Sequence, residues 1–433
     1  MVISRIFFLA GLLLFCPLVI VAQSSWTVFH GPNRDNVSSE TGLLQSWKEG
    51  GPPLLWKVNS IGTTEFPGYA SVTVAAGRVF TAGNVKTGST DQEAVSRVFA
   101  LDEKTGNEIW HYDNGPGWTD KNHYPGERST PTIDGNNIYA YSSIGRIACL
   151  DTATGREIWA RDLRKEYEAT PPVWAYAESP FVDGNKVLIW VGGTKAAVVA
   201  LDKMTGKTIW ETPSTGLRGN YCSMTPFTLG ERKGYVSMNQ AGVFAVDAET
   251  GGFLFFVPHK TEWDVMATNP YFYDNKLFVT SGYGTGARLF ELNTYGNMIV
   301  PTEVWKKPEF DNMHGGVVIK DGYAYTSTHY YKRQRNWMCI KLEDGSTAWE
   351  APGVSMGAIT CADGMLYCVS ERDPTATLVK ATPEKYEETG RFTLPTEEEG
   401  GGVGIYWAHP VVCNKKLYLR HGKTLYCYDV AEK

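Results

Sequence analysis

Aromatic and basic side chains recur in a few short segments of the chain, and their types suit the binding of a sugar. Flat aromatic rings stack on the C–H faces of a carbohydrate, while charged groups hydrogen-bond to its hydroxyls. The alternative is that these rings only fill gaps in the core, because aromatic residues make up 13% of the chain. The set comprises Trp118, His123, Tyr124, Arg128, Tyr167, Trp174, Tyr176, Arg218, Tyr221, His314, Tyr406, Trp407 and His409.

Three histidines of this set, His123, His314 and His409, would bind a metal if the fold brought them together. No two of them share a tight metal-binding motif. A single histidine in a tyrosine-rich loop more often packs and hydrogen-bonds. We therefore predict no metal site from this pattern.

A repeated phrase predicts the elements that position these side chains. Leu-Asp-x-x-Thr-Gly-x-x-Ile-Trp begins at Leu101, Leu150 and Leu201, and Val246 begins a fourth copy that has Phe255 in place of the tryptophan. Asp can hydrogen-bond the backbone of a turn and Gly supplies a positive φ, so each phrase predicts a hairpin. A fixed period indicates an array of one supersecondary unit. We expect the tryptophans to be wedges between neighbouring units.

A count of these units predicts an all-β fold, an eight-bladed β-propeller of four-stranded antiparallel blades. Turn signals such as Asp134-Gly135 and Asp183-Gly184 precede strands in eight places along the chain. The last unit ends near Asp429 and lacks its outer strand, which the segment Leu54–Val58 can supply. We therefore predict that this N-terminal strand closes the ring and leaves no unpaired edge.

Eight loops should converge on one face of such a ring, because each blade's outer strand must connect to the innermost strand of the next. Long loops on a rigid scaffold usually carry function. We expect function to lie on this channel face. The loops run over residues 63–71, 114–131, 163–180, 214–226, 258–270, 308–316, 352–360 and 395–410.

The first residues indicate export. Arg5 precedes an apolar run from Ile6 to Ala22, followed by polar residues, which is typical of a secretory signal cleaved after Ala22. We expect residues 1–22 to be a signal peptide, residues 23–433 to be one propeller, and the mature protein to be periplasmic or extracellular. A retained membrane anchor is the alternative, since the run could just span a bilayer.

The cysteine positions and the net charge disfavour two properties, lipidation and nucleic-acid binding. Cys16 lies in the apolar run after bulky Leu14-Phe15, which disfavours a lipidation motif, and seven cysteines remain. Cys149, Cys339 and Cys427 fall on equivalent strands, as expected for small buried residues. A net charge of −6 disfavours nucleic acid as a partner.

Two features of the chain resemble a known family. The repeat phrase is similar to that of pyrroloquinoline-quinone-type (PQQ-like) propellers, and the opening Trp26-Thr27-Val28-Phe29-His30-Gly31-Pro32-Asn33-Arg34 resembles the N-terminus of exported single-domain members. That family includes quinoprotein alcohol dehydrogenases and the propeller lipoprotein of outer-membrane protein assembly. The resemblance covers essentially all of the mature chain, and it implies the fold more specifically than the activity.

The resemblance also implies a candidate catalytic segment. Pro258 to Asp264 is loosely similar to the Pro-His-Asp-x-Trp-Asp stretch of quinoprotein dehydrogenases, in which the last Asp lies beside the quinone and its metal. By that resemblance alone, Asp264 would be the general base as hydride passes from an alcohol to the quinone. The register differs by one residue, and no vicinal disulfide is present. Glu178 and Asn269 are the nearest substitutes for the calcium ligands.

These observations favour an exported binding module for a carbohydrate-like molecule or an envelope protein, with no cofactor and no stable membrane insertion. One alternative is a dehydrogenase that uses PQQ with calcium and Asp264, and another is a scaffold in outer-membrane protein assembly. The identity of the ligand stays open. The residues we expect to bind it are Tyr124, Arg128, Trp174, Glu178, Tyr221, Trp263, Asn269, His314, Trp407 and His409.

Overall fold

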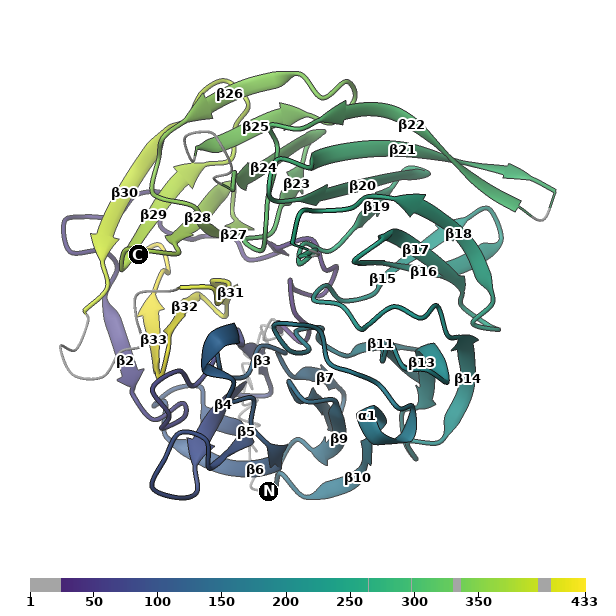
Figure 1. The fold of residues 1–433 in the computed structure, drawn as a ribbon. Helices are drawn as coiled ribbons and strands as arrows, with labels where there is room; N and C mark the ends of the chain where they lie inside the picture. The colour runs from purple at the N-terminus through teal and green to yellow at the C-terminus, as the bar shows by residue number, and fades with distance from the viewer. Residues whose placement is uncertain (1–24, 264, 297, 330–335, 396–405) are drawn as a thin grey trace, which may run out of the picture.

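The computed structural model describes residues 25–433, apart from 264, 297, 330–335 and 396–405. This part of the chain forms a closed ring of eight blades, each of four antiparallel strands, around a central axis (Figure 1). The predicted all-β, eight-bladed propeller is therefore confirmed. A short strand, β1 (Val37–Ser38), adds a parallel fifth strand to the inner edge of the seventh blade. The short helices α1 (Leu163–Glu166) and η1 (Lys121–His123) are confined to loops of the ring.

The blades follow one another in chain order, each written here from its inner to its outer strand. The first four blades are β3 (Thr73–Ala75), β4 (Arg78–Lys86), β5 (Ala94–Asp102) and β6 (Glu108–Pro116); β7 (Thr132–Asp134), β8 (Asn137–Tyr141), β9 (Arg146–Asp151) and β10 (Glu157–Asp162); β11 (Phe181–Asp183), β12 (Lys186–Trp190), β13 (Ala196–Asp202) and β14 (Thr208–Pro213); and β15 (Thr225–Leu229), β16 (Arg232–Asn239), β17 (Gly242–Asp247) and β18 (Phe253–Pro258).

The last four blades repeat this arrangement. They are β19 (Tyr271–Tyr273), β20 (Lys276–Ser281), β21 (Gly286–Tyr295) and β22 (Met298–Lys307); β23 (Val318–Lys320), β24 (Tyr323–Ser327), β25 (Trp337–Lys341) and β26 (Thr347–Ala351); β27 (Gly357–Ala362), β28 (Met365–Ser370), β29 (Thr375–Lys380) and β30 (Glu388–Thr393); and β31 (Val411–Cys413), β32 (Lys416–His421), β33 (Thr424–Asp429) and β2 (Leu54–Val58).

Each repeat phrase forms the turn between the third and fourth strands of a blade. Asp102 Oδ1 accepts hydrogen bonds from the backbone N–H of Lys104 and of Thr105 and from the Thr105 hydroxyl. Gly106 follows at φ +75°, a conformation in which a Cβ is disfavoured. The same contacts recur at Asp151, Asp202 and Asp247. The turn chemistry predicted from the sequence is thus what shapes each hairpin.

The repeat tryptophans lie between blades, which confirms the predicted wedge. Trp159 is 9% exposed, and its Nε1 donates to Lys203 O of the next blade at 3.0 Å. Its ring lies against Gly206, where a Cβ would come within 2.7 Å of the indole. Five other tryptophans donate from Nε1 to a backbone oxygen in the corresponding turn of the next blade. They are Trp56, Trp110, Trp210, Trp305 and Trp349. The glycine of the phrase therefore serves both its own turn and the preceding blade's tryptophan.

The ring closes as the terminal segments predict. Strand β2 pairs antiparallel with β33, with Leu54 opposite Tyr428 and Val58 opposite Leu425. The eighth blade thus combines the two ends of the described chain (Figure 1). Closure covers the outer edge of β33, which would otherwise present unpaired N–H and C=O groups.

A second N-terminal feature was not foreseen. Residues 26–40, named here the N-terminal belt, pass along the inner strands of the ring and hydrogen-bond to every blade in turn. The side chain of Arg34 donates to the backbone carbonyls of Met224 and Pro180, and that of Asn36 donates to Val317 O. Further bonds join the belt to Val74, Ile133, the Tyr271 hydroxyl, Cys361 and Asn414. The belt therefore fastens the blades to one another from inside.

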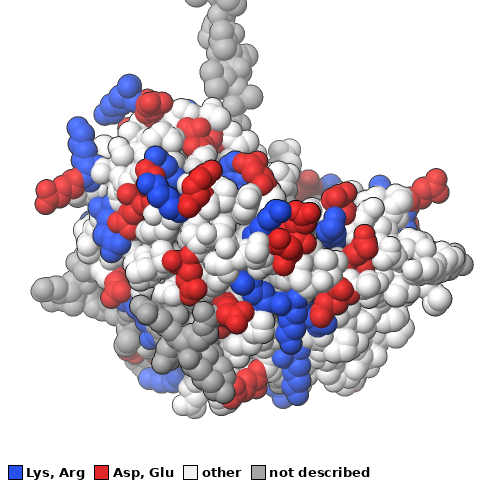
Figure 2. Space-filling model, turned by 90° about the horizontal axis from the view of Figure 1, so that it is seen from above, with Lys and Arg blue, Asp and Glu red and all other residues white. Residues whose placement is uncertain are grey.

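Other sequence features have clear structural outcomes. The seven described cysteines are buried and unbridged, in line with the expectation for Cys149, Cys339 and Cys427. Within the described residues, no helix has the length and apolar character to cross a membrane. Figure 2 shows Lys and Arg interspersed with Asp and Glu over the face in view, so neither sign of charge dominates there.

Candidate ligand-binding site at the channel face

All eight predicted loops contribute to a single cavity of about 430 Å³ on the channel face. The belt adds Phe29 to its wall. The turns that follow β20, β24 and β28 add Tyr283, His329, Glu371 and Arg372. The loops contribute Tyr69, Tyr124, Arg128, Trp174, Ala177, Tyr221, Trp263, Val265, Ala267, Met313, His314, Met356, Trp407 and His409.

Trp407 is the centre of an aromatic group in this cavity. Its ring centroid lies 4.7 Å from that of Tyr69, 5.1 Å from that of Tyr124 and 5.1 Å from that of His314. Loops before the first, second, sixth and eighth blades therefore meet at one indole. Trp407 is partly exposed, so part of its face is accessible from the cavity.

Among the described residues of the cavity wall, Glu371 is the one with a carboxylate, and three side chains contact it. Glu371 Oε2 accepts from Trp407 Nε1 at 3.1 Å and lies 3.3 Å from His314 Nε2, while Oε1 accepts from Arg372 Nε at 3.0 Å. Burial raises the pKa of Glu371, but the hydrogen bond and charge of His314, with smaller contributions from Arg372 and Trp407, lower it to about 2. The carboxylate is therefore ionised at neutral pH.

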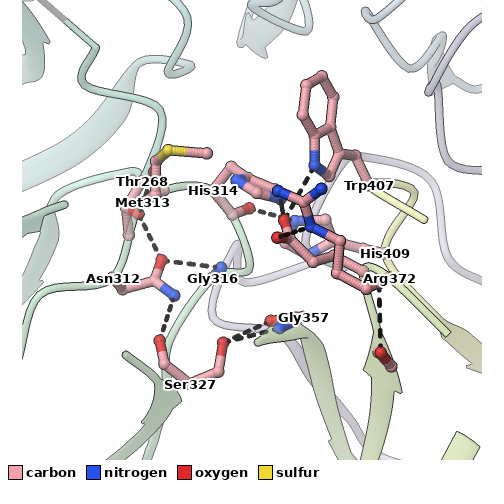
Figure 3. A network of polar contacts seen from close by, with 12 residues as sticks. Thr268, Asn312, Met313, His314, Gly316, Ser327, Gly357, Arg372, Trp407 and His409 are labelled. Carbon is pink, nitrogen blue, oxygen red and sulfur yellow. Dashed lines mark hydrogen bonds and ion pairs between the residues drawn. The ribbon is translucent and has the colours of Figure 1, made fainter. Parts of the chain in front are cut away.

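Two histidines complete this polar group. Burial lowers the pKa of His409 to about 4, so its ring is neutral at neutral pH. His409 Nε2 donates to the backbone oxygen of His314 at 2.8 Å, which leaves Nδ1 as a hydrogen-bond acceptor. Within the described residues, that Nδ1 has no partner. Figure 3 shows His314, His409, Arg372 and Trp407 turned toward one another.

A neighbouring network holds the loops that carry these residues. Asn312 Oδ1 accepts from Thr268 Oγ1 at 2.7 Å and from Gly316 N at 3.1 Å, and its Nδ2 donates to Ser327 O. The Ser327 hydroxyl in turn bonds to the backbone of Gly357 (Figure 3). These bonds join the fifth, sixth and seventh blades under the cavity wall, so the polar group has a rigid support.

Arg128 lies in the cavity wall, but its guanidinium donates hydrogen bonds mainly to the backbone of its own loop. Its guanidinium donates to the backbone oxygens of Gly126, His123 and Tyr124 and lies 5.4 Å from the centre of the Tyr69 ring. Burial lowers the pKa of Arg128. The residue thus fixes the conformation of residues 123–128 and supplies positive charge to the cavity.

The structure brings most of the expected ligand-binding residues into this one cavity. They are Tyr124, Arg128, Trp174, Tyr221, Trp263, His314, Trp407 and His409. Asp264, the residue for which the quinoprotein resemblance implies a catalytic role, lies outside the described residues. Its neighbours Trp263 and Val265 both line the cavity.

Two expected residues are buried away from the cavity wall. Glu178 accepts from Trp190 N with both carboxylate oxygens, and burial raises its pKa to about 8 despite that bond and the charge of Arg34. Asn269 accepts from Ser223 N at 2.8 Å. Both side chains therefore satisfy backbone groups inside the ring.

Part of the aromatic and basic set has structural roles instead. Tyr176 is buried and donates to Val191 O, Tyr406 stacks on His421, and His123 pairs with Asp120. Among the described residues, no group of three or more His, Cys, Asp or Glu is arranged to hold a metal. The three histidines considered as metal ligands thus do not form such a group.

Four residues of the cavity wall were not predicted from the sequence, because they lie in turns between the second and third strands of a blade and not in the loops between blades. These turns share a face with the loops between blades, since antiparallel strands alternate in direction. Glu371 and Arg372 directly follow β28, and His329 and Tyr283 take similar positions after β24 and β20. A polar or aromatic residue just after the second strand of successive blades was the sequence pattern that could have predicted these wall residues.

Comparisons with known proteins agree on the fold. A family model described as outer membrane protein assembly factor BamB matches residues 48–252 and, in an overlapping match, residues 94–351. The search of curated proteins found no match.

Three solved structures illustrate the structural likeness. The quinohemoprotein alcohol dehydrogenase from Comamonas testosteroni is 14% identical with a TM-score of 0.64, covering 94% of this chain and 81% of its own. BamB from Moraxella catarrhalis is 14% identical with a TM-score of 0.55, covering 83% and 94%. A europium-containing methanol dehydrogenase is 14% identical with a TM-score of 0.64, covering 91% and 89%. At these identities the likeness shows the fold alone.

Proposed function

Since the chain belongs to the PQQ-like propeller repeat family, whose matching model is described as outer membrane protein assembly factor BamB, we propose that it is an exported binding module. Its ligand is carbohydrate-like and enters the cavity of the channel face. The proposal includes removal of residues 1–22 as a signal peptide and a periplasmic or extracellular location.

One observation carries the proposal: flat aromatic faces and a buried, ionised carboxylate meet in the same cavity. The rings of Trp407, Tyr124 and Tyr69 offer surfaces for the C–H face of a sugar. Glu371 lines the cavity and can accept a hydrogen bond from a sugar hydroxyl, because both oxygens of an ionised carboxylate are acceptors. A sugar, apolar on its faces and polar at its rim, matches this combination.

The donor set argues against the quinone enzyme as the first choice. The resemblance to quinoprotein dehydrogenases implies acidic and amide ligands for calcium beside the cofactor. Around the cavity, the described residues supply one carboxylate, Glu371, which already contacts Trp407, Arg372 and His314, and they supply no Asn or Gln. The described wall does not fit that cofactor and its metal.

A scaffold in envelope protein assembly is the second candidate. The family description names an assembly factor, and a BamB structure covers 83% of this chain. A protein partner would bind the same channel face or the exposed outer surface. This candidate predicts capture of an envelope protein in the absence of any saccharide.

Calorimetric titration of the purified mature protein with a panel of neutral, acidic and amino sugars tests the proposal. We expect a saccharide to bind and Trp407→Ala to weaken it about tenfold or more, the loss expected when roughly 1.4 kcal/mol of stacking is removed. Tyr295→Ala is the matched control, since Tyr295 is an exposed aromatic residue of the β21–β22 hairpin, which lies outside the cavity wall.

The same preparation, supplied with PQQ and calcium, is then assayed for dye reduction with alcohols and sugars. We expect no turnover. Quinone-dependent turnover that Asp264→Asn abolishes, without saccharide binding, would replace the binding module with the dehydrogenase. If Trp407→Ala leaves saccharide binding unchanged, the saccharide does not bind in this cavity.

A further inference from the structure

A second cavity of about 300 Å³ adjoins the first on the channel face. Tyr221 lines both cavities. Sequence neighbours divide between them: Val173 lines the second and Trp174 the first, while Met266 lines the second and Val265 the first. The two cavities therefore lie side by side and meet at Tyr221. The other residues of the second cavity are Pro172, Arg218, Gly219, Asn220, Met238, Asn239 and Gln240.

Asn220 brings an unused hydrogen-bond acceptor to the second cavity. The side chain is 2% exposed, and its Nδ2 donates to Ser237 Oγ at 2.8 Å and to Met238 O at 2.9 Å. The backbone oxygen of Met238 fixes the orientation of the amide, because a carbonyl oxygen can only accept and the amide nitrogen is the donor. Within the described residues, Asn220 Oδ1 has no partner. A buried polar atom without a partner costs free energy until a ligand or water satisfies it.

Asn239 brings the complementary donor. It is 1% exposed, and its Oδ1 accepts from Ala241 N at 2.9 Å and from Gly242 N at 3.1 Å. Two N–H groups can only bond to the oxygen, so the orientation of this amide is fixed as well. Its Nδ2 has no partner in the described part of the chain. A sugar hydroxyl can satisfy either atom, because it both donates and accepts.

The charges around the two cavities favour an acidic ligand. Arg218 is exposed and lines the second cavity, while Arg128 and Arg372 line the first. Against these three arginines, the described lining offers one carboxylate, that of Glu371. The chain as a whole has the opposite balance, with 41 Lys and Arg against 47 Asp and Glu. Positive charge is therefore concentrated where a ligand would lie.

We infer that the two cavities are consecutive subsites for an acidic oligosaccharide built of uronic acid units. One sugar ring stacks on Trp407 in the first cavity. Its neighbour passes Tyr221, bonds its hydroxyls to Asn220 and Asn239, and places its carboxylate at Arg218. The guanidinium of arginine matches a carboxylate with two parallel hydrogen bonds. The inference rests on the proposed function and specifies the ligand's charge and minimum length.

The test is calorimetric titration with galacturonate oligomers of one to four units and with neutral galactose oligomers of the same lengths. We expect the galacturonate dimer to bind about tenfold or more tightly than the monomer, and the neutral dimer to gain less. Arg218→Gln should abolish the gain from monomer to dimer. Arg156→Gln, at an exposed arginine in a turn of the second blade, makes the same charge change and should preserve it.

A second variant tests the amide pair instead of Arg218, and the neutral oligomers control for the negative charge that it adds. Asn239→Asp retains an oxygen for Ala241 N and Gly242 N but replaces the free donor, so the gain should fall here too. If monomer and dimer bind equally well, or if neutral and acidic dimers bind equally well, the second subsite is wrong while the first cavity keeps its role. If no saccharide of either series binds, the proposed function fails together with this inference.

Discussion

The contact between Trp159 and Gly206 gives the sharpest test of how the blades are held together. Gly206 has φ +70°, and a Cβ there would come within 2.7 Å of the indole of the preceding blade. Two separate costs therefore attend Gly206→Ala: the left-handed backbone, about 1 kcal/mol, and the overpacking, about 1–3 kcal/mol. Only the second cost depends on Trp159.

The double-mutant cycle separates the two costs. Trp159→Ala alone should cost about 3–5 kcal/mol, since it removes a buried ring and the bond from Nε1 to Lys203 O. Adding Gly206→Ala to that variant should then cost only about 1 kcal/mol, because the clashing ring is gone. The cycle should yield a coupling of about 1–3 kcal/mol.

Gly184→Ala is the matched control. Gly184 also has a positive φ, +58°, but a Cβ there would meet nothing within 4 Å. It should cost about 1 kcal/mol in either background and show no coupling to Trp159. Urea unfolding followed by far-ultraviolet circular dichroism measures all variants without relying on tryptophan fluorescence. Additivity of Trp159→Ala and Gly206→Ala within about 0.5 kcal/mol would refute the packing explanation of the repeat.

Three further predictions concern the polar interior and the N-terminal segment. The pKa of Glu371 falls from 4.5 unfolded to about 2 folded, so its stabilisation is present above pH 4.5 and lost toward pH 2. The stability gap between wild type and Glu371→Gln should shrink by about 2 kcal/mol from pH 6 to pH 3 in urea titrations, and a constant gap would contradict this. Arg34→Met should cost about 1–3 kcal/mol, because it leaves Met224 O without its buried donor, while Pro180 O keeps the bond from the Thr132 hydroxyl; a loss below about 0.5 kcal/mol would show that the belt is not needed there. Deletion of residues 24–58 should expose the edge of β33 and cause aggregation in light scattering, whereas a monomer that melts as high as the full mature protein would refute the closure.

The fold was predictable because its determinants are local and repeated. The turn chemistry of Asp102, Thr105 and Gly106 lies within a few residues, and each copy of the phrase reports the same hairpin independently. Pairing of β2 with β33 followed from a missing strand at one end and an extra strand at the other. The belt was not predictable in this way, since the bonds of Arg34 and Asn36 join segments that are far apart in the chain.

The site was predictable only in part. Loop aromatics such as Trp174, Tyr221 and Trp407 could be placed on the channel face from topology. The role of Glu371 depends on contacts from two other blades, which no local pattern reveals. Glu178 misled for the opposite reason: a loop carboxylate is usually solvated, yet this one is buried and bonded to Trp190 N.

A crystal structure of the protein with a saccharide that binds in calorimetry would show directly where the ligand lies. We expect a sugar ring against Trp407 in the cavity where the eight loops meet, with a hydroxyl at hydrogen-bond distance from Glu371. A saccharide bound on the outer face of the blades, with no sugar beside Trp407, would contradict this expectation.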